Sequence, residues 1–94
     1  MKESMAEERR RIEFHGHVQG VGFRYQARHY ASAYGLKGWV RNEYDGSVTM
    51  EVQGNPTVIH MMLKQLTSDR YISIEWVDSK NIPLEDGTGF HVKY

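Results

Sequence analysis

The sequence predicts one α+β domain in which a mostly antiparallel sheet carries two helices on one face. Apolar residues alternate with polar ones in several short segments and recur at helical spacing in two others. These segments follow one another in the order strand, helix, strand, strand, helix, strand, with a short final strand. A chain of 94 residues has room for one domain. We expect this domain to span residues 11–94, after a flexible, charged lead-in over residues 1–10.

The first strand and the first helix flank a glycine-rich segment. Ile12 and Phe14 alternate with polar residues over residues 11–18, which is typical of a strand with one buried face. Glycines at 16, 20 and 22 then indicate a tight loop. The helical stripe that follows consists of Phe23, Ala27, Tyr30, Ala31 and Tyr34. Gly35 predicts the C-terminal end of this helix.

The second half repeats the alternation of strands and helix. Residues 36–42 are expected to form a strand, and Asp45-Gly46 predicts a hairpin turn into the next strand. Asn55-Pro56 supplies an N-cap and a first helical residue. The remaining apolar positions are Val48, Met50 and Val52 in the third strand, Val58, Ile59, Met62, Leu63 and Leu66 in the second helix, Ile72, Ile74 and Trp76 in a fourth strand, and Phe90, Val92 and Tyr94 in the last.

This order is the split βαβ, or ferredoxin-like, arrangement. Right-handed crossovers make the first and second strands parallel, so their C-terminal ends lie at the same edge of the sheet. The first strand ends at the loop of residues 16–22, and the second ends near Asn42. The topology therefore brings two segments together that are distant in the sequence.

The loop of residues 16–22 differs from a plain connection in two ways. No Ser, Thr, Asp or Asn stands just before Phe23 to cap the helix, so its first N–H groups have no obvious acceptor. Arg24 lies in the first turn, where the helix dipole disfavours a cation. A bound anion would accept the N–H groups and neutralise the guanidinium. Taken alone, this spacing also fits a simple tight turn with Arg24 on the surface, and Asn42 alone fits a turn former at a strand end.

Two stretches of the sequence carry a resemblance to a known family. They are Gly16-His17-Val18-Gln19-Gly20-Val21-Gly22-Phe23-Arg24, and Gly38-Trp39-Val40-Arg41-Asn42 with the later Asp45-Gly46-Ser47-Val48. Together they resemble the acylphosphatase family over about residues 11–54, while the second half agrees mainly in element order and in the closing Phe90-His91-Val92. The resemblance implies the split βαβ fold and hydrolysis of acyl phosphates to carboxylate and inorganic phosphate.

The resemblance also implies roles for single residues. Arg24 and the backbone amides of Val18, Gln19, Gly20, Val21 and Gly22 would hold the phosphate, and Asn42 would position the attacking water. The bound phosphate would accept the proton, so neither a metal nor a cofactor is expected. The sequence departs from the family pattern at His17, where Arg or Lys is more common, and at residues 67–70, where a Gly-Pro-like segment is usual.

Composition excludes several other classes of protein. The chain has no cysteine, and its twelve basic residues balance twelve acidic ones, which argues against broad nucleic-acid or anionic-membrane binding. His15 and His17 are two apart on a strand, but no third metal ligand is evident in the sequence. We expect a cytoplasmic monomer that acts on a small-molecule acyl phosphate.

Two other functions remain open at this point. One is a non-catalytic binding module, because fold alone does not decide function. The other is a domain that handles carbamoyl phosphate, as in hydrogenase-maturation proteins that resemble this family.

Overall fold

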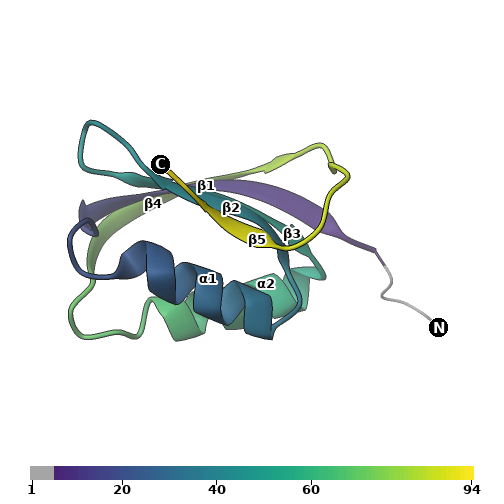
Figure 1. Cartoon of the computed structure of the whole chain (residues 1–94), viewed down its shortest axis with the longest axis horizontal. Coiled ribbons are helices and arrows are strands. Elements are labelled where there is room, and N and C mark those ends of the chain that lie inside the picture. Colours follow the sequence, from purple (N-terminus) through teal and green to yellow (C-terminus); the bar gives the residue numbers. More distant parts are fainter. Residues whose placement is uncertain (1–5) are drawn as a thin grey trace.

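A computed structural model describes residues 6–94 and shows one five-stranded sheet with two helices on one face (Figure 1). The elements in chain order are β1 (Glu8–His17), α1 (Phe23–Ala33), β2 (Lys37–Asn42), β3 (Val48–Gly54), α2 (Pro56–Leu66), β4 (Ser73–Ile82) and β5 (Phe90–Lys93). The strand order across the sheet is β4-β1-β3-β2-β5. The predicted α+β fold and element order are confirmed.

Strand pairing places the ends of β1 and β2 at the same edge of the sheet. Both strands pair with β3 in antiparallel fashion, so they run parallel to each other on either side of it. β5 pairs with β2 in parallel, which brings the C-terminus to the same end of the molecule (Figure 1). The β1–α1 loop, the β2–β3 turn and the end of β5 therefore cluster at one end.

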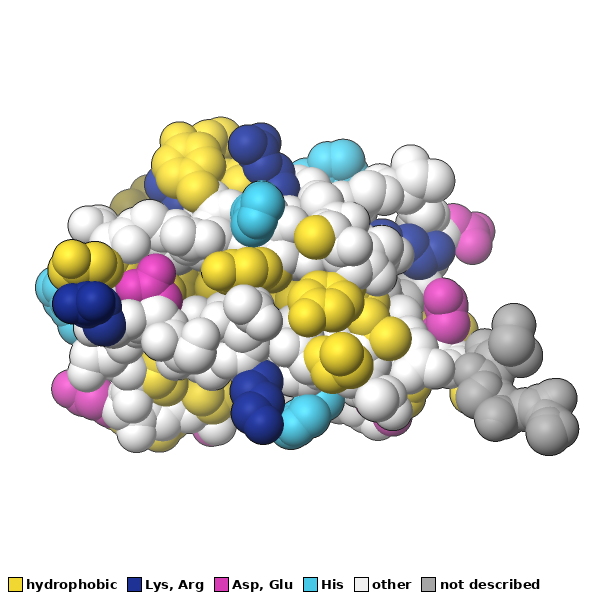
Figure 2. Space-filling view, turned by 90° about the horizontal axis from the view of Figure 1, so that it is seen from below, with side chains coloured by type: hydrophobic (Ala, Val, Ile, Leu, Met, Phe, Trp, Pro, Cys, Tyr) yellow, Lys and Arg dark blue, Asp and Glu magenta, His cyan; other side chains and the backbone are white. Residues whose placement is uncertain are grey.

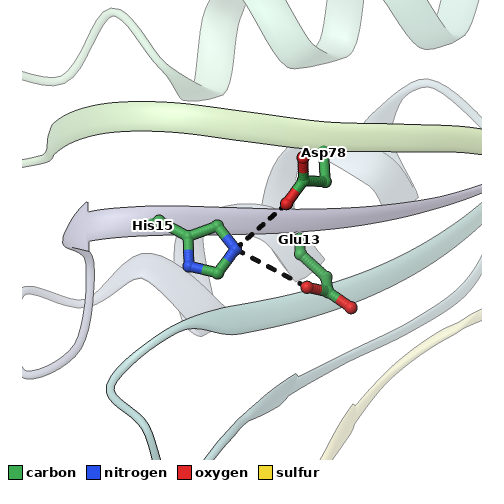
Figure 3. Close-up of side chains that lie close together, drawn as sticks. All are labelled: Glu13, His15 and Asp78. Carbon is green, nitrogen blue, oxygen red and sulfur yellow. Dashed lines mark ion pairs between the residues drawn. The ribbon is translucent and has the colours of Figure 1, made fainter.

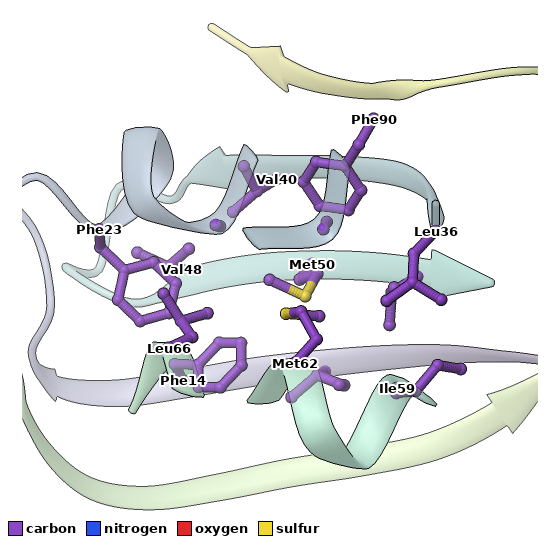
Figure 4. Close-up of a cluster of buried hydrophobic side chains, with 14 of the residues drawn as sticks. Phe14, Phe23, Leu36, Val40, Val48, Met50, Ile59, Met62, Leu66 and Phe90 are labelled. Atoms are coloured by element: carbon purple, nitrogen blue, oxygen red, sulfur yellow. The ribbon is translucent and has the colours of Figure 1, made fainter. Parts of the chain in front are cut away.

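The core lies between the helices and the sheet (Figure 4). The rings of Phe14 in β1 and Phe23 at the start of α1 lie 4.9 Å apart, which anchors the first turn of α1 to the sheet. The buried residues of the two helices follow the predicted stripes and are Phe23, Ala27, Ala31, Ile59, Met62 and Leu66. Burial of these faces from water supplies most of the free energy that holds the helices on the sheet.

The helix ends agree with the sequence signals. After α1, the chain turns through Gly35 at φ 72°, and the N–H of Leu36 donates to the carbonyl of Ala31 at 2.9 Å. This hydrogen bond satisfies one of the last carbonyls of the helix. At α2, the side chain of Asn55 accepts hydrogen bonds from the N–H groups of Thr57 and Val58. Both ends are thus capped by the residues that the sequence indicated.

β1 begins earlier than the sequence predicted. Residues 1–5 of the expected lead-in lie outside the described residues, but Glu8, Arg9 and Arg10 already belong to the strand. Arg9 is only 4% exposed, and its guanidinium lies 3.0 Å from Glu51 and 3.1 Å from Gln53 on β3. From sequence alone a charged residue is expected to be exposed to solvent. Here polar partners on the neighbouring strand offset the cost of burying the guanidinium.

β4 differs from the prediction both in its length and in the side of the sheet to which Trp76 points. It extends over ten residues to Ile82, and its pairing with β1 shifts register where His15 faces Trp76 but Gly16 faces Ile74. Such a shift is a bulge, which reverses the side to which the following residues point. Ile72 and Ile74 pack on the core, whereas Trp76 stacks on the ring of His15 and is 54% exposed. The expected alternation of Ile72, Ile74 and Trp76 on one face is therefore wrong at Trp76.

The helix-covered face carries no concentrated charge. Basic and acidic side chains lie scattered on this face between apolar and neutral ones (Figure 2). No helix within residues 6–94 is long and apolar enough to span a bilayer.

Candidate active site

A small cavity lies where the β1–α1 loop meets the end of β2. Its volume is about 140 Å³. The lining residues are Val18, Gly20, Gly22, Phe23, Arg24, Tyr25 and Asn42. The structure thus brings together Arg24 and Asn42, eighteen positions apart in the sequence, as the parallel arrangement of β1 and β2 predicted.

The loop backbone curls because two glycines adopt left-handed conformations. Gly20 has φ 75° and Gly22 has φ 80°. A Cβ at either position would meet no atom within 4 Å, so backbone conformation rather than space requires glycine here. Other residues reach this region only at a cost of about 1–2 kcal/mol.

The N-terminus of α1 has unsatisfied donors, as the sequence indicated. Gly22 is the N-cap residue and offers no side chain, and the first turn contains no acidic residue. Among the residues that the structure describes, none accepts a hydrogen bond from the backbone N–H groups of Val18 to Tyr25. The helix dipole adds a partial positive charge at this end. The cavity therefore presents hydrogen-bond donors suited to an anion.

Arg24 is held by the end of β5 without being neutralised. Its Nη1 donates to the carbonyl of Lys93 at 3.4 Å, and its guanidinium carbon lies 5.0 Å from the centre of the Tyr94 ring. Within residues 6–94, no carboxylate forms an ion pair with it. Its positive charge therefore remains available to a ligand in the cavity. Sequence reasoning missed Lys93 and Tyr94, because no local pattern links them to Arg24.

Gln19 fixes the loop to the β2–β3 hairpin rather than lining the cavity. Its Nε2 donates to the carbonyls of Glu43 at 2.7 Å and Ser47 at 2.8 Å. Val21 likewise does not line the cavity and packs against the core, while Val18 is 1% exposed. Gln19 and Val21 therefore hold the loop from outside the cavity, which Val18, Gly20 and Gly22 line.

Asn42 is the last residue of β2 and lies opposite Val48 of β3. It is partly buried, and it lines the cavity together with Arg24. An amide side chain at a strand end offers both an acceptor and a donor to a small molecule in that cavity.

The hairpin turn beside the loop carries two carboxylates that stay charged. The hydroxyl and N–H of Ser47 donate to Asp45 at 2.6 and 2.9 Å, and these hydrogen bonds lower the pKa of Asp45. A hydrogen bond from the side chain of Thr49, and then the neighbouring Arg41, lower the pKa of Glu43 against the opposing effect of burial. At neutral pH the turn is therefore anionic, and the cation that lines the cavity is Arg24.

The two histidines noted in the sequence do not act together. His15 lies between Glu13 and Asp78 on the other face of β1 from the core (Figure 3). His17 is exposed and pairs with Ser73 beyond the bulge, so it does not join this cluster. The cluster was missed because Asp78 comes from the neighbouring strand β4, whose register against β1 could not be predicted from the sequence.

Comparisons with known proteins agree with the geometry. The acylphosphatase family model matches residues 10–92. The acylphosphatase of Bifidobacterium longum is 38% identical over 89 residues, which cover 94% of this chain and 92% of that protein. The acylphosphatase of Ligilactobacillus salivarius is 36% identical over 81 residues, covering 84% and 90% of the two chains.

Solved structures give the same result. The crystal structure of acylphosphatase from Bacillus subtilis superposes with a TM-score of 0.86 at 28% identity, covering 93% of this chain and 99% of that one. Full-length HypF superposes with a TM-score of 0.83, but at 24% identity and over only 12% of its own chain, so that likeness shows the fold alone. Because the family model and the curated relatives span nearly the whole chain, this protein belongs to the acylphosphatase family and hydrolyses acyl phosphates to carboxylate and inorganic phosphate.

Proposed function

We propose that the cavity between the β1–α1 loop and Asn42 is the active site, and that the phosphoryl group of the substrate binds in it. The observation that carries this proposal is the composition of the cavity of about 140 Å³. Backbone N–H groups without acceptors, an Arg24 without an acidic partner, and Asn42 all border it. The backbone amides of Val18, Gln19, Gly20, Val21 and Gly22 form the cradle. The free N–H groups in the first turn of α1 add further donors next to these amides.

Arg24 and the amides stabilise charge on the transferring group. The oxygens of the phosphoryl group bear the charge in a loose transition state, so fixed donors aimed at them lower the barrier. The guanidinium is planar and can donate to two oxygens at once. The contacts of Arg24 with the Lys93 carbonyl and the Tyr94 ring restrict its motion before the substrate binds, which reduces the entropy cost of that arrangement.

Asn42 orients the water that attacks phosphorus. The water oxygen forms a bond to phosphorus while the bond from phosphorus to the acyl oxygen breaks, and the carboxylate leaves with that electron pair. A proton of the water passes to an oxygen of the phosphate. Asparagine is too weak a base to take this proton, so its role is to hold the water in line with its carbonyl and amide groups. The carboxylate is a good leaving group and needs no acid.

The substrate is a small-molecule acyl phosphate, and the enzyme acts as a cytoplasmic monomer without a metal in its active site. The cavity is large enough to surround a phosphoryl group but not a large acyl group, which must extend into solvent. Recognition of the shared phosphoryl group predicts activity on several acyl phosphates. The chain has equal numbers of basic and acidic residues, and the charges on its helix-covered face are scattered (Figure 2). Both features fit a small-molecule substrate better than a polyanionic partner.

The assay that tests the proposal measures release of inorganic phosphate from benzoyl phosphate. Asn42→Ala should lower kcat by about 100-fold or more, as loss of a single positioned polar group in an active site typically does. Competitive inhibition by inorganic phosphate should persist in this variant, because the cradle and Arg24 remain. Arg24→Ala should lose both turnover and phosphate inhibition while circular dichroism shows a folded domain.

Asn81→Ala provides a matched control, because Asn81 is an exposed strand residue that pairs with Arg10 near the start of β1 and does not line the cavity. It should hydrolyse benzoyl phosphate at the wild-type rate. Near-normal turnover in Asn42→Ala would exclude Asn42 from positioning the water, and retained phosphate inhibition in Arg24→Ala would exclude Arg24 from phosphate binding.

A further inference from the structure

We propose that Glu13, His15 and Asp78 form a binding site for a divalent transition-metal cation, zinc above all, on the sheet face that the helices leave open. The Nε2 of His15 lies 3.5 Å from Oε1 of Glu13 and 3.5 Å from Oδ2 of Asp78 (Figure 3). One ligand atom from each of the three residues lies within 4.8 Å of the others. None of these three residues lines the proposed phosphate cavity.

The spacing matches metal coordination. In a tetrahedral zinc site with metal–ligand bonds of about 2.1 Å, ligand atoms are about 3.4 Å apart. The two distances from His15 Nε2 are close to that value. Direct hydrogen bonds between these groups would be shorter, at about 2.7–3.0 Å. A cation between the three atoms therefore fits their separation better than a direct contact does.

The backbone presets this arrangement. Glu13 and His15 are two residues apart on β1 and face the same side, opposite to the buried Ile12 and Phe14. Asp78 lies directly across from Glu13 in the β1–β4 register. The ring of His15 stacks on Trp76 with centres 4.4 Å apart and planes 8° from parallel, which restricts the imidazole. Two strands and one stacked ring thus hold three ligands before any ion binds.

The polar environment of His15 favours a cation. Its Nε2 is buried and makes no hydrogen bond within the described residues, although it points toward two carboxylates. A buried ring nitrogen without a hydrogen bond is costly, and metal coordination would satisfy it. Arg11 lines the neighbouring hollow with Lys80, but its guanidinium is already bound to Glu51 at 2.7 Å. The carboxylates of Glu13 and Asp78 therefore remain available.

The donor set identifies the class of ion. One imidazole nitrogen and two carboxylate oxygens suit zinc, cobalt and nickel, whereas magnesium and calcium prefer oxygen ligands alone. Three protein ligands leave a fourth position for water. Glu13 and Asp78 are 44% and 68% exposed, so the site is open to solvent, and we expect it to bind the ion more weakly than a closed structural zinc site does. A bound ion would link β1 to the edge strand β4.

Trp76 provides a reporter for this site. The chain has two tryptophans, so Trp39→Phe leaves Trp76 as the only one. Cobalt is an open-shell ion that quenches indole fluorescence at short range. Titrating cobalt into Trp39→Phe should give saturable quenching of Trp76, zinc should reverse it by competition, and magnesium at the same concentration should not.

Variants of the ligands decide the outcome. His15→Gln and Asp78→Asn, each made in the Trp39→Phe background, should weaken cobalt binding at least tenfold. His29→Gln, which changes an exposed histidine on α1, should not alter it. Asp78 is exposed, so Asp78→Asn keeps the test valid if His15→Gln fails to fold. The absence of saturable quenching, or equal quenching in Trp39→Phe and in the Asp78→Asn variant, would overturn the proposal.

Discussion

At the scale of single residues, Arg24 combines a position that the helix disfavours with contacts that preserve its charge. It occupies the first turn of α1, where the dipole repels a cation, and it has no acidic partner in the described chain. Its neighbours are a carbonyl at Lys93 and the ring of Tyr94, which orient the guanidinium and leave its charge unbalanced. This arrangement costs stability in the free protein, and under the proposed function a bound phosphate would recover that stability.

Arg24→Lys separates charge from geometry at this position. Lysine keeps the positive charge but is a point donor without a planar fork, and it cannot stack on Tyr94 as a guanidinium does. We expect kcat/KM for benzoyl phosphate to fall by about 100-fold, comparable to the loss of one preorganised donor. Arg28→Lys, at an exposed position of the same helix, should leave kcat/KM unchanged. Comparable activity in the two lysine variants would show that charge alone suffices.

At the scale of elements, the β1–α1 loop depends on the β2–β3 hairpin for its shape. Gln19 is the connection, since its amide donates to two hairpin carbonyls, those of Glu43 and Ser47. These carbonyls follow Asn42 in the sequence, so the same hairpin positions both Asn42 and the β1–α1 loop, for which we propose the water-orienting and phosphate-binding roles. A change in the hairpin should therefore reach the loop through Gln19.

Gln19→Ala and Gln19→Glu test this connection. Each lost hydrogen bond costs about 1 kcal/mol net, so Gln19→Ala should lower the free energy of unfolding by about 1–2 kcal/mol and weaken inhibition by phosphate. Gln19→Glu has the same shape but turns a carboxylate oxygen toward two carbonyls, so it should be worse on both measures. Urea unfolding and phosphate inhibition of benzoyl phosphate hydrolysis measure the two effects. Unchanged phosphate affinity in both variants would mean that the loop holds its shape alone.

The hairpin turn should also show a pH dependence through Asp45. Its pKa in the folded protein is lowered by the hydrogen bonds from Ser47, so the charged form stabilises the fold. A lowered pKa gives stability that is present above the ordinary value of about 3.9 and lost as pH falls through the native value. The stability of the wild type should therefore exceed that of Asp45→Ala at pH 7, and the difference should shrink below about pH 4.

Urea unfolding of both proteins across that pH range measures the difference. Asp86→Ala, in the exposed β4–β5 loop, corrects for the removal of a negative charge from the surface. A difference between the wild type and Asp45→Ala that stayed constant or grew with acid would contradict the assigned role of the carboxylate.

Elements with a strong local pattern were predictable from sequence, and those that depend on pairing were not. The stripe of Phe23, Ala27 and Ala31 and the cap at Asn55 depend on residues close in sequence, so both were found. The start of β1 was missed because Arg9 is buried against partners on β3, Glu51 and Gln53, which lie more than forty positions away in the sequence. The bulge that turns Trp76 outward depends on how β4 meets β1, which the sequence of β4 alone does not encode.

The candidate site likewise has parts that were predictable from local sequence and parts that were not. The loop glycines and Arg24 stand in one segment, and the parallel placement of β1 and β2 followed from topology, so the meeting of Arg24 with Asn42 could be predicted. The contact of Arg24 with Lys93 spans sixty-nine positions, and it exists because β5 pairs with β2. Short-range patterns contain no information about that pairing, since the last strand carries only four residues.

At the scale of the whole molecule, the cavity joins three parts of the sheet. It is lined by the loop after β1 and the end of β2, and the end of β5 holds Arg24. A ligand in the cavity contacts a site that exists only when these strands are assembled, so binding is linked to global folding. The domain is small, and it therefore responds to a modest binding energy with a large change in melting temperature.

Inorganic phosphate should accordingly stabilise the fold through this site. At a phosphate concentration of 100 times its Kd, the free energy of unfolding should rise by about 2.7 kcal/mol. For a domain of this size, the corresponding rise in Tm is about 10 °C or more. Thermal unfolding followed by circular dichroism, with sodium chloride at matched ionic strength as the reference, measures it. Arg24→Ala should show no phosphate-specific rise in Tm, because it lacks the guanidinium that we propose binds the anion in the cavity. An equal rise in the wild type and Arg24→Ala would place the bound phosphate elsewhere on the molecule, since only binding at the cavity depends on that side chain.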